Sequence, residues 1–169
     1  MGMGQTLLVL AALAILASVT ISSNRLVLNQ VDVVQGSEAL ITGTGIGQEM
    51  VEQVTEKYFD GNVIPPKTTD TVSILSAPLT FGPEAGEIAT DPTTFHDIDD
   101  YDGYMDSVYT SRLGYFYRTD RVCYVSENPP YADTTAQTFL KKVYVTIKNP
   151  YLGTPGDSIQ ISKVVSYRY

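Results

Sequence analysis

The aspartates around Gly103 form the densest group of side chains in this sequence that could do chemistry. They lie within ten residues of one another: Asp97, Asp99, Asp100, Asp102 and Asp106. Carboxylates this close repel one another unless water, a basic side chain or a hard cation neutralises them, and Ca²⁺ takes about 6–8 oxygen ligands. The spacing is not that of an EF-hand, because Gly103 at the sixth loop position puts Ile98 at the first. Two interpretations stay open: a loop that is solvated or paired with arginine, and a structural Ca²⁺ site at Asp97, Asp99, Asp100 and Asp102.

The other reactive side chains do not form a catalytic set. His96 stands beside Asp97, but the sequence has no Gly-x-Ser-x-Gly motif to supply a nucleophile. The single cysteine, Cys123, lies in a strand-like pattern where a small buried residue is expected. We therefore expect no enzyme and, apart from the Ca²⁺ interpretation, no cofactor.

Charge is distributed unevenly along the chain. The 169 residues carry a formal net charge of −8, which argues against a nucleic-acid partner because the chain repels a polyanion. Residues 58–107 hold ten acids against Lys67, whereas residues 108–169 hold eight bases against four acids. The acidic middle and the basic C-terminal third are therefore suited to contacts with each other, within a subunit or between copies.

The N-terminal segment has a different composition from the rest. No charge precedes Arg25, no aromatic residue precedes Tyr58, and residues 7–21 are apolar apart from Ser18 and Thr20. A secretory signal peptide would need a basic residue before the apolar run, and the core helix of a soluble domain would need a polar face; this segment has neither. With its neutral flanks the stretch can span a bilayer, which takes about 20 residues. We expect these side chains to lie in lipid or in the core of a filament: Leu7, Leu8, Leu10, Leu13, Ile15, Leu16, Val19 and Ile21.

Helical spacing of apolar residues continues beyond Arg25. Ile46, Met50, Val54 and Tyr58 make one stripe at intervals of four, which predicts an unusually long helix from about Gln5 to Tyr58. The glycines between residues 36 and 47 weaken its middle, so two shorter helices are the alternative. Pro65 and Pro66 prevent the helix from resuming.

The C-terminal third predicts an antiparallel sheet. Residues 112–118 and 121–126 read as a hairpin that turns at Thr119-Asp120, and residues 142–148 alternate strictly. Residues 158–167 supply a fourth strand. The predicted fold class is α+β, with a long N-terminal helix packed on a four-stranded antiparallel sheet and an acidic connecting loop region. The expected domains are an apolar half-helix at 1–28 and a globular part at 29–169, divided into half-helix 29–58, loop region 59–107 and sheet 108–169.

This arrangement resembles the type IV pilin family, including the pseudopilins of type II secretion. The text FHDIDDYDG at 95–103 and the strand at 141–147 are similar to mannose-sensitive-haemagglutinin-type minor pilins, as is the helix-to-loop sequence from Ser37 to Asp60. The junction Gly4-Gln5 looks like the site where a prepilin peptidase removes a short leader. Two positions depart from the family pattern: Gln5 stands where the family has Phe, and Val9 where it has Glu.

The resemblance implies a structural subunit of an extracellular type IV pilus-like filament that polymerises through its apolar helix. The implied partners are further copies of the chain, and before assembly the inner membrane and the pilus assembly machinery. Two alternatives stay open: a minor pilin or pseudopilin that primes a pilus or a type II secretion filament, and a single-span membrane-anchored binding module. Pseudopilins that resemble this chain hold Ca²⁺ in an Asp-rich loop, which is the resemblance behind the metal interpretation.

Overall fold

The computed structural model describes residues 2–64, 69–153 and 156–167. One helix, α1 (Met3–Thr55), runs through the glycine-containing stretch without a break, so the long helix is confirmed and the two-helix alternative is wrong. The chain divides into two compact units, Met1–Glu38 and Ala39–Tyr169, and each is described by itself. The expected functional boundary after residue 28 stays a prediction.

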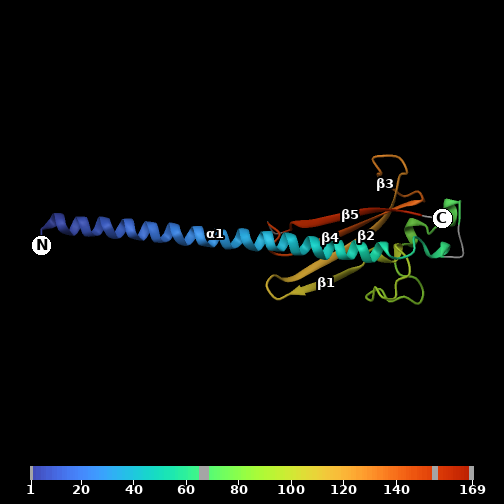
Figure 1. Ribbon diagram of the computed structural model, residues 1–169, viewed down its shortest axis with the longest axis horizontal. Coiled ribbons are helices and arrows are strands. Elements are labelled where there is room, and N and C mark those ends of the chain that lie inside the picture. The colour runs from blue at the N-terminus through green and yellow to red at the C-terminus, as the bar shows by residue number, and fades with distance from the viewer. Residues whose placement is uncertain (1, 65–68, 154–155, 168–169) are drawn as a thin grey trace. The chain divides into compact units, whose positions relative to one another are not determined.

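The sheet belongs to the second unit and is antiparallel. Its main strands are β1 (Met105–Thr110), β2 (Gly114–Val125), β4 (Leu140–Lys148) and β5 (Ser158–Ser166), in the order β1-β2-β4-β5. A two-residue strand, β3 (Asp133–Thr134), pairs with the end of β2. Figure 1 shows the C-terminal part of α1 lying over one face of this sheet. The predicted fold class, α+β with a long helix on an antiparallel sheet, is confirmed.

One detail of the predicted sheet is wrong. The hairpin does not turn at Thr119-Asp120, because β2 continues through both residues and pairs with β1 on one side and β4 on the other. The turn lies earlier, between Thr110 and Gly114, so β1 begins inside the region that we expected to be loop. The physical reason is burial: inward and outward residues alternate through the middle of β2, and Asp120 takes an inward position that a turn would have exposed.

The core of the second unit lies between the sheet and residues 39–55 of α1. The inward residues of β4 are Val143, Val145 and Ile147, all fully buried as their alternation predicted. They belong to the same cluster as five residues of the helix: Ala39, Ile46, Met50, Val51 and Val54.

Two glycines bring α1 close to the sheet. A Cβ on Gly47 would lie 2.6 Å from Ile147 Cδ1 and 2.7 Å from Ile161 Cδ1, and one on Gly43 would lie 2.9 Å from Ile159 Cδ1. Gly45, between them, has nothing within 4 Å of its would-be Cβ. The spacing of Gly43 and Gly47 therefore places both on the face that packs against β4 and β5.

The region between α1 and β1 is ordered by short 3₁₀ turns and by aromatic packing. The turns are η1 (Gly61–Val63), η2 (Val72–Ile74), η3 (Pro78–Thr80) and η4 (Asp99–Tyr101). Phe95 packs edge-on against Tyr101 and Tyr104, with ring centroids 4.9 and 5.6 Å away. This ring cluster gives the acidic loop its own piece of the core.

Candidate functional site

The apolar half of α1 carries the residues that we expected in lipid or in a filament core. The side chains concerned are between 54% and 73% exposed: Leu7, Leu8, Leu10, Leu13, Ile15, Leu16, Val19 and Ile21. Within the first unit a single helix has no second element against which to bury them. An 18-residue stretch of α1 has a mean hydropathy of 2.2. By length and composition the helix is therefore long and apolar enough to cross a membrane. The helix is therefore compatible with membrane anchoring.

The hydroxyl groups in this stretch are satisfied by the helix itself. Ser18 Oγ donates to the Ile15 carbonyl and Thr20 Oγ1 to the Leu16 carbonyl, each at 2.8 Å. Local bonds of this kind remove the need for water at a polar side chain inside an apolar medium. The expected cleavage residues, Gly4 and Gln5, lie in the first turn of α1.

Three of the four aspartates of the candidate metal site, Asp97, Asp99 and Asp100, lie together on one segment of the acidic loop, and oxygens of Asp97 and Asp100 face backbone N–H groups. Asp97 Oδ1 accepts from the N–H groups of Asp99 and Asp100, and its Oδ2 accepts from Gly61. Asp100 Oδ2 accepts from His96 and Asp97, each at 2.9 Å. Asp102 lies apart from these and accepts from Val122 in β2 at 2.8 Å. These carboxylates hold the loop in shape.

A buried lysine supplies the base that the acidic loop needs. Lys141 Nζ, fully buried at the start of β4, donates to Asp99 Oδ1 at 2.6 Å and to Asp60 Oδ2 at 3.1 Å. We expected the basic C-terminal third to neutralise the acidic loop, and Lys141 does so, although the first interpretation of the loop named an arginine. Neither Lys141 nor Asp60 was predicted from the sequence to belong to this group. The sequence does carry a signal for Lys141, because the alternation of β4 places this residue on the same inward face as Val143, Val145 and Ile147.

Burial also raises the pKa values of two carboxyl groups in the loop. Burial, together with the charges of Asp99 and Asp100, raises the pKa of Asp97 to about 9. Burial raises the pKa of Asp100 to about 6, although the N–H groups of Asp97 and His96 act in the opposite direction. Among the described residues no group of three or more His, Cys, Asp or Glu side chains is arranged to hold a metal ion. The Ca²⁺ site therefore stays a prediction that this geometry does not support.

A second buried acid–base group lies on β1 and β2. Arg118 donates to Asp106 through two nitrogens, Nε at 2.6 Å and Nη2. Asp120, 1% exposed, lies on the same inward face, and within the part of the chain that the structure describes neither of its carboxylate oxygens has a hydrogen-bond partner. Burial raises the pKa of Asp120 to about 7, against the opposing charge of Arg118.

The residues considered for catalysis are not assembled into a reactive group. His96 lies at the surface with Nδ1 2.5 Å from Glu87 Oε1. Burial raises the pKa of the Cys123 thiol to about 11, so the thiolate is scarce at neutral pH. The two side chains sit on different elements, the acidic loop and β2.

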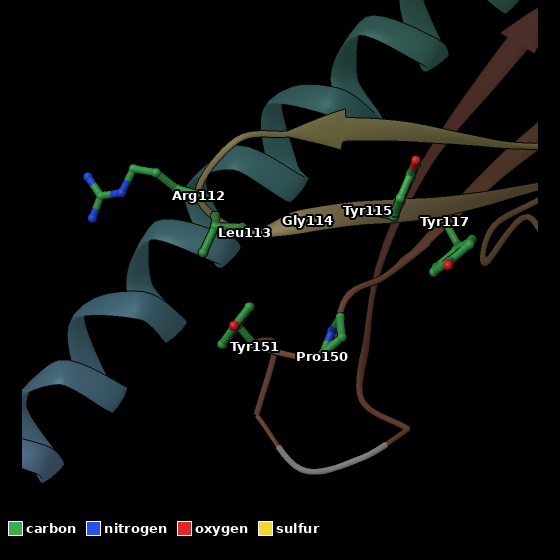
Figure 2. Close-up of a pocket in the computed structure, with 7 residues that line it drawn as sticks. All are labelled: Arg112, Leu113, Gly114, Tyr115, Tyr117, Pro150 and Tyr151. Carbon is green, nitrogen blue, oxygen red and sulfur yellow. The ribbon is translucent and has the colours of Figure 1, made fainter.

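A shallow groove opens on the second unit beside the start of β2. It has a volume of about 310 Å³ and is lined by Arg112, Leu113, Gly114, Tyr115, Tyr117, Pro150 and Tyr151. Figure 2 shows Pro150 and Tyr151, from the loop after β4, on the opposite side of the groove from the β2 residues. The rings of Tyr115 and Tyr117 are half exposed and nearly parallel, with centroids 6.3 Å apart. This groove offers aromatic faces to a ligand.

Comparison of the chain with protein-family models, with curated proteins and with solved structures finds no match. Outside the sequence itself, the resemblance to pilins therefore rests on the architecture. A long apolar N-terminal helix on an antiparallel sheet is compatible with a pilin-like fold.

Proposed function

We propose that this chain is a structural subunit of an extracellular type IV pilus-like filament and that it polymerises through the apolar half of α1. The observation that carries the proposal is the exposure of the side chains from Leu7 to Ile21 on a helix that has no partner within its own unit. Burying one Leu or Ile side chain is favourable by roughly 1.5–3 kcal/mol. Several copies of the helix, packed together, would bury this surface.

The same surface suits the steps before assembly. The apolar half of α1 would lie in the inner membrane until the pilus assembly machinery transferred the subunit to the filament. We propose that removal of residues 1–4 leaves Gln5 as the first residue. Mass spectrometry of the N-terminal peptide from purified filaments tests this, and a peptide that begins at Met1 contradicts it.

Electron microscopy combined with a matched pair of substitutions tests the filament proposal. An arginine at the centre of a membrane helix costs about 2.5–3.5 kcal/mol for insertion. Leu13→Arg places that charge in the middle of the apolar stretch, whereas Asn24→Arg places it beside Arg25 at the edge. Negative staining of material sheared from cells should show filaments for the wild type and for Asn24→Arg, and none for Leu13→Arg.

Other outcomes favour the alternatives. Filaments from Leu13→Arg would contradict assembly through this segment. A wild-type chain that stays in the membrane fraction and never forms filaments would favour a single-span anchored binding module, for which the tyrosine-lined groove is the supporting observation. A minor pilin or pseudopilin would be present in few copies per filament, which quantitative mass spectrometry of the filament measures.

A further inference from the structure

The surroundings of Lys141 are those of a reaction site rather than of a surface ion pair. Its Nζ is fully buried and has three oxygen atoms within hydrogen-bond distance: Asp99 Oδ1 at 2.6 Å, Phe59 O at 2.7 Å and Asp60 Oδ2 at 3.1 Å. Three aromatic rings surround the same atom, with centroids at 4.7 Å for Phe59, 5.1 Å for Phe81 and 5.4 Å for Tyr124. An amine and two carboxylates are thus held in contact in a pocket that excludes water.

The two carboxylates differ in how they are held. Asp60 accepts hydrogen bonds from Ser76 N at 2.8 Å, from Ser76 Oγ at 3.1 Å and from Asn62 N at 3.1 Å, in addition to that from Lys141. These donors fix its orientation. Asp99 makes the shorter contact with Nζ and stands in η4, on a turn of the loop. The geometry makes Asp99 the acyl group and Asp60 the group that moves a proton.

We propose that Lys141 and Asp99 condense to form an intramolecular isopeptide bond, with Asp60 as the catalytic base. The ammonium of Lys141 first passes one proton to the Asp99 carboxylate, which gives an amine and a carboxylic acid in contact. The nitrogen lone pair then attacks Cγ of Asp99, forming the C–N bond and a tetrahedral intermediate. Asp60 takes a second proton from that nitrogen and gives it to the hydroxyl on Cγ. The C–O bond breaks, one water molecule leaves, and Asp60 is a carboxylate again.

The buried position provides the driving force for this condensation. In water an ammonium and a carboxylate are strongly hydrated, so they have little tendency to combine. In a pocket from which water is excluded, both ions have lost that hydration and their charges are costly to keep. The amide replaces two buried charges with one neutral group, and the water released escapes to solvent. The bond would join β4 to the acidic loop whether or not the chain forms filaments, so this inference does not depend on the proposed function.

Peptide mapping of the full-length wild-type chain tests the bond. Mass spectrometry of the intact, denatured protein gives a mass that can be compared with the mass calculated from the N-terminal residue actually present. We expect the measured mass to be lower by one water molecule. We expect trypsin to leave the bond after Lys141 uncut, and a branched peptide to join the segment that contains Asp99 to the one that contains Lys141. The branched peptide is the decisive result, because a cyclic imide at Asp60-Gly61 or Asp102-Gly103 would remove the same water.

Substitutions separate the roles of the three residues. Lys141→Arg keeps the positive charge but should have the full mass, whereas Lys142→Arg, on the opposite face of the same strand, should remain cross-linked. In Asp99→Asn the amine of Lys141 should attack the same carbon, Cγ. The cross-linked variant should then be lighter than its own sequence mass by one ammonia molecule instead of one water molecule. Asp60→Asn should leave most of the protein uncross-linked.

Two results would overturn the proposal. One is a wild-type digest in which trypsin cleaves after Lys141 and only linear peptides are found. The other is a branch at Asp60, which would contradict the assignment of Asp99. The wild-type digest decides the question even where a variant does not fold.

Discussion

Asp120 illustrates how an inward position in a strand changes the chemistry of a carboxyl group. Burial disfavours the charged carboxylate and raises the pKa of Asp120 from its ordinary value of 3.8 to about 7 in the folded protein. Between these values the folded state binds a proton that the unfolded state has lost, so the free energy of unfolding falls as the pH rises. Above about pH 7 both states are ionised and the loss of stability is complete.

We expect Asp120→Asn to stabilise the protein at pH 8 by about 1–3 kcal/mol, because a neutral amide of the same shape avoids the buried charge. The fall in stability between pH 4 and pH 7 should also be shallower than in the wild type. Urea denaturation at a series of pH values measures both effects. Asp70→Asn, at an exposed position, controls for the loss of one charge. An unchanged slope in Asp120→Asn would contradict this, because it would show that the carboxyl group ionises at the same pKa in the folded and unfolded states.

At the scale of single residues the sequence predicted the acidic group but not its partners. The clustering of Asp97, Asp99 and Asp100 is visible in the sequence, and so is the excess of bases in the C-terminal third. One of these bases, Lys141, lies beneath the loop because of the register of β4. The contribution of Asp60 depends on how the chain leaves α1. Long-range placement of this kind has no local sequence pattern.

At the scale of elements, the glycines of α1 have opposite roles on opposite faces of the helix. Gly47 is buried against Ile147 and Ile161, and Gly45 is exposed. Replacing glycine by alanine inside a helix is favourable by about 0.5–1 kcal/mol when the methyl group has room. Forcing a methyl group into a packed interface costs about 1–3 kcal/mol.

We therefore expect Gly45→Ala to stabilise the second unit and Gly47→Ala to be less stable than Gly45→Ala by about 1–3 kcal/mol. Chemical denaturation of the two variants in parallel measures the difference. Equal stabilities would show that the isoleucine side chains move aside without loss, and that the close approach of helix and sheet is not a constraint on this sequence.

Regular patterns were sufficient to predict α1 and β4, and an irregular one misled the prediction of β2. Apolar spacing of four residues continues through the glycines of α1, and the alternation in β4 has no exception. Thr119 and Asp120 resemble turn residues, yet the strand passes through them because the inward site accepts an aspartate near Arg118. The inward position of Asp120 in β2 thus prevails over the local turn preference.

At the scale of the whole molecule, the two units have different requirements. The second unit has its own core, whereas the apolar residues of the first unit are exposed. We expect deletion of residues 1–28 to leave a folded, soluble monomer. Size-exclusion chromatography and circular dichroism measure this. Filaments formed by the truncated chain would place the assembly surface elsewhere.

Composition changes along the chain, since no charge precedes Arg25 and no aromatic residue precedes Tyr58. The sequence does not show where the compact unit begins, because the apolar repeat of α1 is continuous across Glu38 and Ala39.

The ring cluster of Phe95, Tyr101 and Tyr104 has a practical consequence for spectroscopy. Every aromatic residue lies at or beyond Tyr58, and the chain has no tryptophan, so ultraviolet absorbance, near-ultraviolet dichroism and tyrosine emission all originate in the second unit. The first unit is silent at these wavelengths. A melting curve followed by tyrosine emission therefore reports the sheet and its loop alone, and comparison with far-ultraviolet dichroism, to which both units contribute, would isolate the behaviour of the apolar helix.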